Sequence, residues 1–524
     1  MRSLSNHSHR LYKKCDGLAI LKLRGLRAWS LNKYQYQALP DGGKNHIRIA
    51  TIHPGTSEQT IQIALRHERF DEDHIPDYEA LSYAWGPLET EADMARIMLE
   101  HQKHSLPFRR GRRRGWLGVR SNLASALKQL RLETKPRDIW IDSLCIDQDN
   151  EVQKGPQVAM MGNIYGRASR VIIWLGTEAR DSNRAMDLMQ SLGVQINVDW
   201  VSLRSTASSQ AVTPNIVDES VPLALEIDDL DALDHLFRRQ WFDRLWIRQE
   251  IFRENQSEAV IHCGSASVHW HIFRCGWYLL NYKERPPHNT HPLWNRQQDL
   301  RGFMIQQQNC TLSNLRYDFK LAQCADPRDR VYAVRGLLKK EIEESIQPDY
   351  TKTVEDVYKD AVLAHFRNHT SFNILCECHF SPQWKGPSWV PDWASNPLID
   401  SHFQWQMASG MITSSVSTDK IAGSCQLLGV CATTVTKLYP TTFKKPNLEQ
   451  PFFTNIHALL MMEHRSFEDP YPSGGTIIEG YVQAMCEGQF LDEAYDYYDL
   501  SRQDVSNLVF RQICEASSKI SMKN

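Results

Sequence analysis

Residues 139–176 read IWIDSLCIDQDNEVQKGPQVAMMGNIYGRASRVIIWLG, and this stretch decides the fold. Its opening IWI is typical of a short buried strand that ends at Asp142, and VIIWL (171–175) is typical of another strand that stops at Gly176. Between them, apolar side chains recur at helical spacing, at Val158, Met161, Tyr165 and Ala168. The stretch therefore predicts a strand, a helix and a strand in succession.

The same alternation extends toward the N-terminus. YEALSYAW (78–85) is strand-like and closes on Gly86, while residues 45–65 alternate polar and apolar side chains as a β-hairpin does. SNLASALKQLR (121–131) places four apolar side chains on one helical face, at Leu123, Ala126, Leu127 and Leu130. Strands that alternate with helices in this way favour an α/β fold with a parallel sheet covered on both faces.

The carboxyl ends of the predicted strands are the expected ligand-binding edge, because ligands of open α/β sheets bind beyond those ends. Trp85 and Gly86 follow one strand, and glycine there permits close backbone approach to a ligand, although a tight turn would need the same residue. Asp142 follows the next strand, where it would either serve a ligand or cap the segment that follows. We predict a ligand site that includes Trp85, Gly86 and Asp142.

Length and composition restrict the class of protein. The chain has 524 residues, which predicts two to four domains, and its 42% hydrophobic content is typical of a globular protein. A formal net charge of -2 provides no overall field for nucleic acid, and no apolar run reaches the roughly 18 residues of a membrane span. The 12 scattered cysteines are typical of reduced thiols. We therefore expect a cytoplasmic protein without a membrane span or a nucleic-acid partner.

One local run of charge departs from this balance: five arginines fall within residues 109–114. Such a run can bind nucleic acid or act as an import signal, but Gly111 interrupts it, Gly115 follows it and no basic helix surrounds it. We interpret it as a solvated loop insertion. The wider stretch 87–120 reads as a loop insertion or as an error in the gene model.

Four blocks in the correct order resemble the fungal heterokaryon incompatibility (HET) domain. They are YEALSYAWG (78–86), IWIDSLCIDQDN (139–150), QVAMMGNIYGRASRVIIWLG (157–176) and RQWFDRLWIRQE (239–250). The blocks CADPRDRVYAVRGL (324–337), PDY (348–350) and PSWVPDWA (387–394) resemble the region that commonly follows this domain. The resemblance implies a role in fungal non-self recognition and regulated cell death, exercised through protein partners.

The HET domain is in turn remotely similar to the TIR domain, a flavodoxin-like module of which some members cleave NAD. The resemblance implies a TIR/flavodoxin-like parallel sheet. Residues 233–252 are predicted to form one helix, on which Trp246 and Glu250 have the W-x-x-x-E spacing of the helix that bears the catalytic glutamate in NAD-cleaving members. A carboxylate near the ribose stabilises the positive charge that develops as nicotinamide leaves. Glu250 is thus the candidate catalytic residue.

Each of these helix residues also has a structural interpretation. Glu250 could instead be salt-bridged to Arg253 or Arg244. Trp246 is a candidate for stacking on a ring of the ligand, but so many aromatic residues on one helix, with Trp241 and Phe242, favour the protein core. No cofactor is firmly implied, and NAD would enter as a substrate.

Other chemistries are excluded or weak. The sequence has no P-loop, no G-x-G-x-x-G after a strand, no H-E-x-x-H and no G-x-S-x-G. Cys145 lacks a nearby His and is predicted to be a buried apolar residue, and the C-x-C-H cluster at 376–379 has no second ligand pair, so no metal site is predicted.

The predicted organisation has three parts. They are an N-terminal extension over 1–44, a HET domain over 45–275 with its core blocks in 78–251, and a mixed, mostly helical C-terminal region over 276–524. Two functions stay open, an enzyme that consumes NAD and a non-catalytic signalling module that works by protein association. A cavity that gathers Trp85, Asp142 and Glu250 at one sheet edge would favour the enzyme, and burial of Glu250 against arginines, with no cleft, would favour the signalling module.

Overall fold

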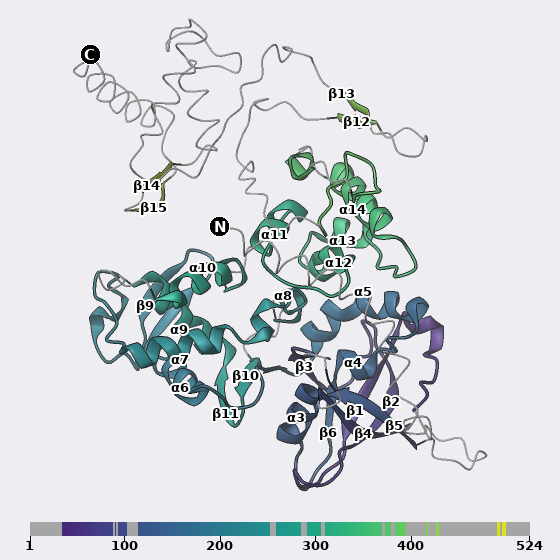
Figure 1. Ribbon diagram of the computed structural model, residues 1–524, viewed down its shortest axis with the longest axis horizontal. Coiled ribbons are helices and arrows are strands. Elements are labelled where there is room, and N and C mark those ends of the chain that lie inside the picture. Colours follow the sequence, from purple (N-terminus) through teal and green to yellow (C-terminus); the bar gives the residue numbers. More distant parts are fainter. Residues whose placement is uncertain are drawn as a thin grey trace, which may run out of the picture. The chain divides into compact units, whose positions relative to one another are not determined.

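A computed structural model describes the chain over residues 34–86, 90, 93–101, 114–251, 258–283, 291–304, 310–368, 373–378 and 383–394, with four short strands beyond residue 414. The chain divides into two compact units, which meet in sequence between Val357 and Tyr358. The first unit contains a large sheet and most of the helices (Figure 1). The predicted boundaries at residues 44 and 275 stay a prediction.

The sheet has nine strands in the order β11-β10-β7-β3-β6-β1-β2-β4-β5. In chain order the strands are β1 (His46–Ile52), β2 (Gln62–Arg69), β3 (Glu79–Tyr83), β4 (Met94–His101), β5 (Arg114–Arg120), β6 (Arg137–Trp140), β7 (Val171–Trp174), β10 (Val260–Cys263) and β11 (Ala266–His269). Four neighbouring strands, β6, β3, β7 and β10, are parallel. The residues of β3 and β7 are almost all buried, as expected for strands covered on both faces, whereas half of the residues in β6 and in β10 are buried.

The prediction of an α/β fold is confirmed, but the sheet is mixed rather than wholly parallel. β1 pairs antiparallel with β6 and with β2, so the predicted hairpin over 45–65 is present and continues the sheet. β4 pairs parallel with β2 and antiparallel with β5. The stretch 87–120 therefore supplies two strands of the sheet, with Ile97, Leu99 and Val119 buried, and is not merely an inserted loop. Residues 109–113 of the arginine run lie outside the described residues.

Helices connect the parallel strands. Before the last parallel strand these are α3 (Ser121–Leu130), α4 (Asp142–Cys145), α5 (Glu151–Arg167), α6 (Ser182–Gly193), α7 (Ile227–Phe237) and α8 (Ile247–Ile251), with a small hairpin of β8 (Ile196–Asp199) and β9 (Arg204–Ala207). Short 3-10 turns lie at Pro40–Gly43, Pro214–Val217 and Gln240–Asp243. The last of these interrupts the helix predicted over 233–252, because Arg239 and Arg244 have extended backbone conformations.

The remaining helices of the first unit are α9 (Trp270–Tyr282), α10 (Pro292–Met304), α11 (Leu312–Asp318), α12 (Asp329–Arg335) and α13 (Lys340–Ser345). Here α6 packs against α9, and an aromatic cluster of Trp241, Phe242, Trp270, Phe273 and Phe303 fills the adjoining core. Trp241 and Phe242 are 0% and 1% exposed. Their interpretation as core residues is confirmed.

The second unit is described over a smaller part of its length. It begins within α14 (Val354–Asn368), at Tyr358, and includes a 3-10 helix (Asn373–Glu377). Two strand pairs follow, β12 (Ser415–Ser417) with β13 (Gln426–Leu428) and β14 (Phe490–Asp492) with β15 (Tyr495–Tyr498). The Tyr358 ring contacts Trp384 and Trp393, and the Trp393 indole donates a hydrogen bond to Glu377 at 2.7 Å. The PSWVPDWA block thus contributes to the packing of this unit.

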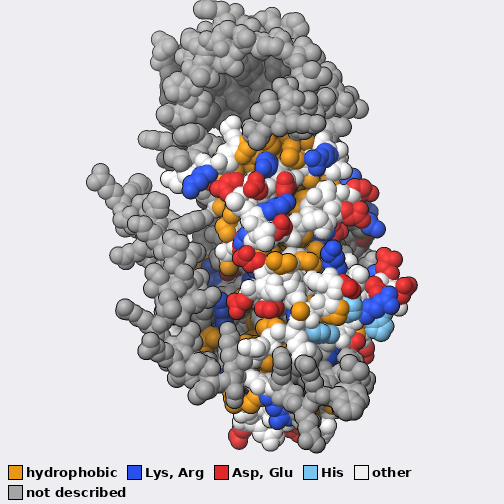
Figure 2. Space-filling view, turned by 90° about the vertical axis from the view of Figure 1, so that its right-hand side faces the viewer, with side chains coloured by type: hydrophobic (Ala, Val, Ile, Leu, Met, Phe, Trp, Pro, Cys, Tyr) orange, Lys and Arg blue, Asp and Glu red, His pale blue; other side chains and the backbone are white. Residues whose placement is uncertain are grey.

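Charged side chains are mixed on the surface. On the described part of the face in Figure 2, acidic and basic side chains alternate over short distances. This distribution agrees with the formal net charge of -2. Within the described residues, no helix is both long and apolar enough to cross a bilayer.

Candidate functional site

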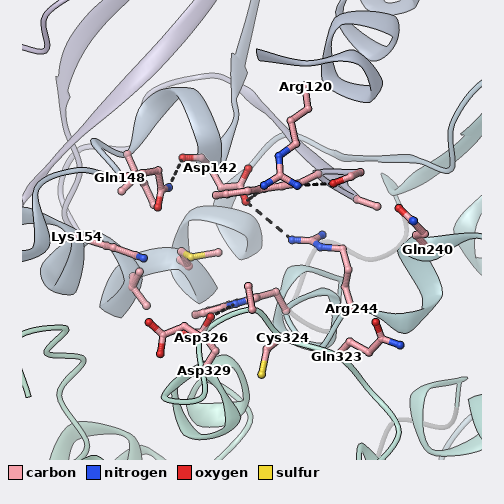
Figure 3. A pocket seen from close by; sticks show the side chains of 18 of the residues that line it. Arg120, Asp142, Gln148, Lys154, Gln240, Arg244, Gln323, Cys324, Asp326 and Asp329 are labelled. Carbon is pink, nitrogen blue, oxygen red and sulfur yellow. Dashed lines mark hydrogen bonds and ion pairs between the residues drawn. The ribbon is translucent and has the colours of Figure 1, made fainter. Parts of the chain in front are cut away.

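A cavity of about 510 Å³ lies beyond the carboxyl ends of β3 and β6 (Figure 3). Its volume falls within the range of small-molecule sites. Four of the five residues proposed from the sequence line it, namely Trp85, Gly86, Asp142 and Trp246. The segment 323–329 and Tyr350 form the opposite wall. Gly176, which follows β7, is not among the lining residues.

Trp85 and Gly86 form the part of the wall that leaves β3. The Trp85 indole donates a hydrogen bond to Asp142 at 2.9 Å, and the Arg120 guanidinium lies over the Trp85 ring at 5.5 Å. Arg120 also donates to the carbonyl of Gly86. Gly86 has φ of +83°, a left-handed conformation that favours glycine, so the turn itself requires this residue. The sequence left open a turn or a ligand loop here; the turn is present and lines the cavity, and the ligand loop stays a prediction.

Asp142 begins α4, and Ile141 alone separates it from the end of β6. Its carboxylate accepts hydrogen bonds from the Trp85 indole and, at 2.7 Å, from the backbone N–H of Ser143. Burial raises the pKa of Asp142, while Arg244, 3.9 Å away, opposes that rise. Asp142 therefore accepts a backbone N–H in the first turn of its own helix and also lines the cavity, and its role toward a ligand stays a prediction.

Glu250 lies behind the cavity and does not line it. Its side chain is 0% exposed, and Arg244 donates to its two carboxylate oxygens at 3.1 and 3.2 Å. Ser82 of β3 donates to the same carboxylate and accepts from the Trp241 indole at 2.8 Å. Burial raises the pKa of Glu250 despite its bonds to Arg244.

The Arg244 guanidinium pairs with Glu250 at 3.1 Å and also lines the cavity, where Figure 3 shows its ion pair with Asp142. Of the two arginines proposed as partners of Glu250, Arg244 is the one that pairs with it, and Arg253 lies outside the described residues. In this conformation Glu250 orients Arg244 and has no contact with the cavity. Of Asp142 and Glu250, Asp142 is the one that lines the cavity.

Trp246 faces the segment that follows the HET blocks. Its indole donates to Asp329 at 3.0 Å, and the Tyr350 hydroxyl donates to the other oxygen of the same carboxylate at 2.7 Å. Burial raises the pKa of Asp329 to about 6. The sequence interpretation did not place Asp329, Asp326, Cys324 or Tyr350 in a site, although the blocks CADPRDRVYAVRGL and PDY that contain them had been identified.

Backbone contacts fix this second wall. Leu245 donates to the carbonyl of Gln323 at 2.8 Å, and Arg244 and Gln323 form a parallel β-bridge. Arg335 of α12 donates to the carbonyl of Ala159 of α5 at 3.0 Å. Residues more than 70 positions apart are thereby held on two sides of one cavity.

A smaller cavity of about 220 Å³ adjoins the first and shares Trp85, Arg120 and Gln148 with it. Aliphatic side chains from β4, β5 and α3 form part of its lining, and Asp147 and Asp149 also lie there. The Trp85–Arg120 stack is thus common to both cavities.

The cysteines of the first unit offer little nucleophilic chemistry. Cys145 is 0% exposed, and burial raises its pKa to about 12, which confirms its interpretation as a buried residue. Cys324 lines the larger cavity, but burial raises its pKa to about 11, so its thiol stays protonated at neutral pH. No group of three or more His, Cys, Asp or Glu side chains gathers as metal ligands would within the described residues. His379 of the C-x-C-H cluster lies outside them.

The sheet, its buried parallel centre and the polar cavity at the strand ends define an α/β domain built around a small-molecule-sized site. Residues 78–250 match the family model described as heterokaryon incompatibility protein (HET). These residues therefore form a HET domain.

One relative supports this assignment along more of the chain. The chain is 26% identical to heterokaryon incompatibility protein 6, OR allele, of Neurospora crassa, over 73% of this chain and 62% of the relative. The chain therefore spans less than two thirds of the length of that relative. No solved structure matches the chain.

Proposed function

We propose that this protein acts in heterokaryon incompatibility, the recognition of non-self between fungi, and that the cavity beyond β3 and β6 is the ligand site of its HET domain. The family and the name of the Neurospora relative support the biological role. The observation that carries the ligand site is the meeting of Trp85, Gly86, Asp142 and Trp246 around one cavity of about 510 Å³.

The ligand proposed for this site is NAD, cleaved as in some TIR domains, with regulated cell death as the outcome. The parallel strands β6, β3, β7 and β10 have the order 2-1-3-4, which is also the order at the start of a flavodoxin-like sheet. In the reaction, the bond between the ribose and nicotinamide breaks with its electron pair on the nicotinamide nitrogen. Water adds to the ribose carbon and one proton is released, so the products are nicotinamide and ADP-ribose.

The two buried carboxylates have different proposed roles in this reaction. Asp142 lines the cavity and would stabilise the positive charge that develops on the ribose. Glu250, the candidate from the sequence, would act by orienting Arg244, and it would contact the substrate itself only after Arg244 turns away.

The test is NAD consumption by the full chain at high concentration, beside Asp142→Asn, Glu250→Gln and the control Glu133→Gln, which changes an exposed glutamate. We expect turnover by wild type and control, loss of kcat in Asp142→Asn, and a smaller loss in Glu250→Gln. Equal turnover by all four proteins would remove both carboxylates from the reaction. Complete loss only in Glu250→Gln would return the catalytic role to Glu250.

The second candidate function is a non-catalytic module that signals by protein association. It is favoured by the burial of the Glu250 carboxylate against Arg244, which keeps it from the cavity. For this function we expect no NAD turnover by a folded, self-associated preparation, as judged by light scattering after gel filtration. Turnover in that preparation would reject this candidate.

A further inference from the structure

The carboxylates that line the larger cavity are already satisfied by protein groups. Asp326 pairs with Arg328 at 2.7 Å, and Asp243 pairs with Arg296 at the same distance. Both oxygens of Asp329 accept hydrogen bonds, from Trp246 and Tyr350, and Asp142 accepts from Trp85 and from Ser143. These groups have little remaining capacity to neutralise a cation.

Two of the cations that line the same cavity lack such a partner. Arg120 contacts the Trp85 ring and the Gly86 carbonyl, and the Lys154 ammonium lies 4.1 Å from the centre of the Tyr350 ring. Among the described residues, neither cation has a carboxylate within 4.0 Å, although Lys154 is close enough to lower the pKa of Asp329. Arg244, the third cation, is held by Glu250.

The two cations approach the cavity from different elements. Arg120 ends β5, whereas Lys154 lies in the first turn of α5, and Figure 3 shows both charged ends directed toward the same space. The Arg120 guanidinium is held over the Trp85 ring and by its bond to the Gly86 carbonyl, and a guanidinium held in place can bind an oxyanion through two parallel N–H bonds. Lys154 adds a compact point charge. A group with several oxygens could meet both side chains.

We propose that Arg120 and Lys154 form an oxyanion site for a phosphate-bearing ligand in the larger cavity. The inference rests on the proposal that this cavity is the ligand site of the HET domain, and it names the class of ligand. Arg120 would bind two oxygens of the phosphate through its guanidinium edge, and Lys154 would bind a third. Burial lowers the pKa of Arg120, and an anion beside it would offset that effect.

Calorimetric titration of the full chain tests this site, with inorganic pyrophosphate, orthophosphate and succinate as probes. Lys154→Gln replaces the ammonium that lies over the Tyr350 ring by a neutral polar group, and Arg120→Lys keeps the charge but removes the planar fork. The matched control is Lys128→Gln on the exposed face of α3. A hydrogen bond to a charged group contributes about 1.5–3 kcal/mol. We therefore expect the Kd for pyrophosphate to rise at least about ten-fold in Lys154→Gln and in Arg120→Lys, and to stay unchanged in the control.

The outcomes separate this inference from the enzymatic proposal. Pyrophosphate binding that depends on Lys154, without NAD turnover, would support the oxyanion site and reject NAD cleavage. NAD turnover with the same KM in wild type and Lys154→Gln would support the enzyme and reject the oxyanion site. Succinate binding as tight as pyrophosphate binding would replace phosphate by carboxylate as the ligand group. Failure of the folded protein to bind any of the probes at 10 mM would overturn the site. A Kd above about 10 mM corresponds to a binding free energy weaker than about 3 kcal/mol.

Discussion

An Arg244→Met variant would leave the Glu250 carboxyl buried without its charged partner. At the observed 3.1 Å and an effective dielectric constant of about 20, the pair interacts with about 5 kcal/mol. In the variant the Glu250 carboxyl can instead bind a proton and become neutral. The loss in the free energy of unfolding therefore cannot exceed the free energy needed to protonate this carboxyl. For a usual pKa of 4.5, that limit is about 3.4 kcal/mol at pH 7 and about 0.7 kcal/mol at pH 5.

The sign of the pH dependence follows from the same argument. In the variant the folded-state pKa of Glu250 rises further above its unfolded value. A group with a raised folded-state pKa contributes stability that is fully present below its unfolded pKa and is lost as pH rises through its folded pKa. The deficit of the variant relative to wild type should therefore grow between pH 5 and pH 7, to about 3 kcal/mol.

Urea unfolding of the full chain, followed by tryptophan fluorescence at pH 5, 6 and 7, measures this deficit, because several indoles are fully buried in the first unit. An Arg244→Met/Glu250→Gln double variant keeps an acceptor for Ser82 and should recover to within about 1 kcal/mol of wild type. The control is Arg184→Met, which breaks a half-exposed pair with Asp229 and should lose less than about 1 kcal/mol. A deficit that does not change with pH, or a double variant no more stable than Arg244→Met, would refute the reasoning.

Three further predictions follow from single contacts. Asp329→Asn should flatten the dependence of the free energy of unfolding on pH. The stability that Asp329 contributes below its usual pKa of 3.8 is lost as pH rises through about 6. In urea unfolding, the difference in the free energy of unfolding between variant and wild type should therefore change by about 3 kcal/mol between pH 4 and pH 7. Gly155→Ala should lower the thermal midpoint, because a Cβ there would lie 2.5 Å from the Pro348 carbonyl oxygen, whereas helix propensity alone would raise stability by about 1 kcal/mol. Gly86→Ala should lose about 1–2 kcal/mol in urea unfolding from its left-handed backbone, since the nearest neighbour of the new Cβ, Asn122, is 3.5 Å away and does not clash.

The centre of the fold could be predicted from the sequence because its signals are local. Apolar runs such as VIIWL have no polar position to expose, so they identify buried strands. A residue that follows such a strand must lie at a strand end, which is why Trp85 and Asp142 were placed in the same site. Their positions depend on chain direction and sheet geometry alone.

The remaining features depend on pairings that periodicity does not encode. A strand such as β1 shows the same alternation whether its neighbour is parallel or antiparallel, so its antiparallel pairing with β6 could not be read from the sequence. The helical pattern of residues 233–252 did not reveal the extended backbone at Arg239 and Arg244. That break is what points Arg244 toward Glu250 and Asp142.

The cavity also bears on where the functional unit ends. The family match stops at residue 250, and the HET domain was predicted to end at 275, yet Asp329 and Tyr350 complete the wall opposite Trp85. A fragment that ends at residue 275 would lack Asp329 and Tyr350, which form that wall. The indole N–H of Trp246, which donates to Asp329, would then lose its acceptor. We therefore expect pyrophosphate binding to be lost in such a fragment even if its sheet folds. Retained binding with unchanged affinity would show that the segment 323–350 covers the cavity without contributing to the site.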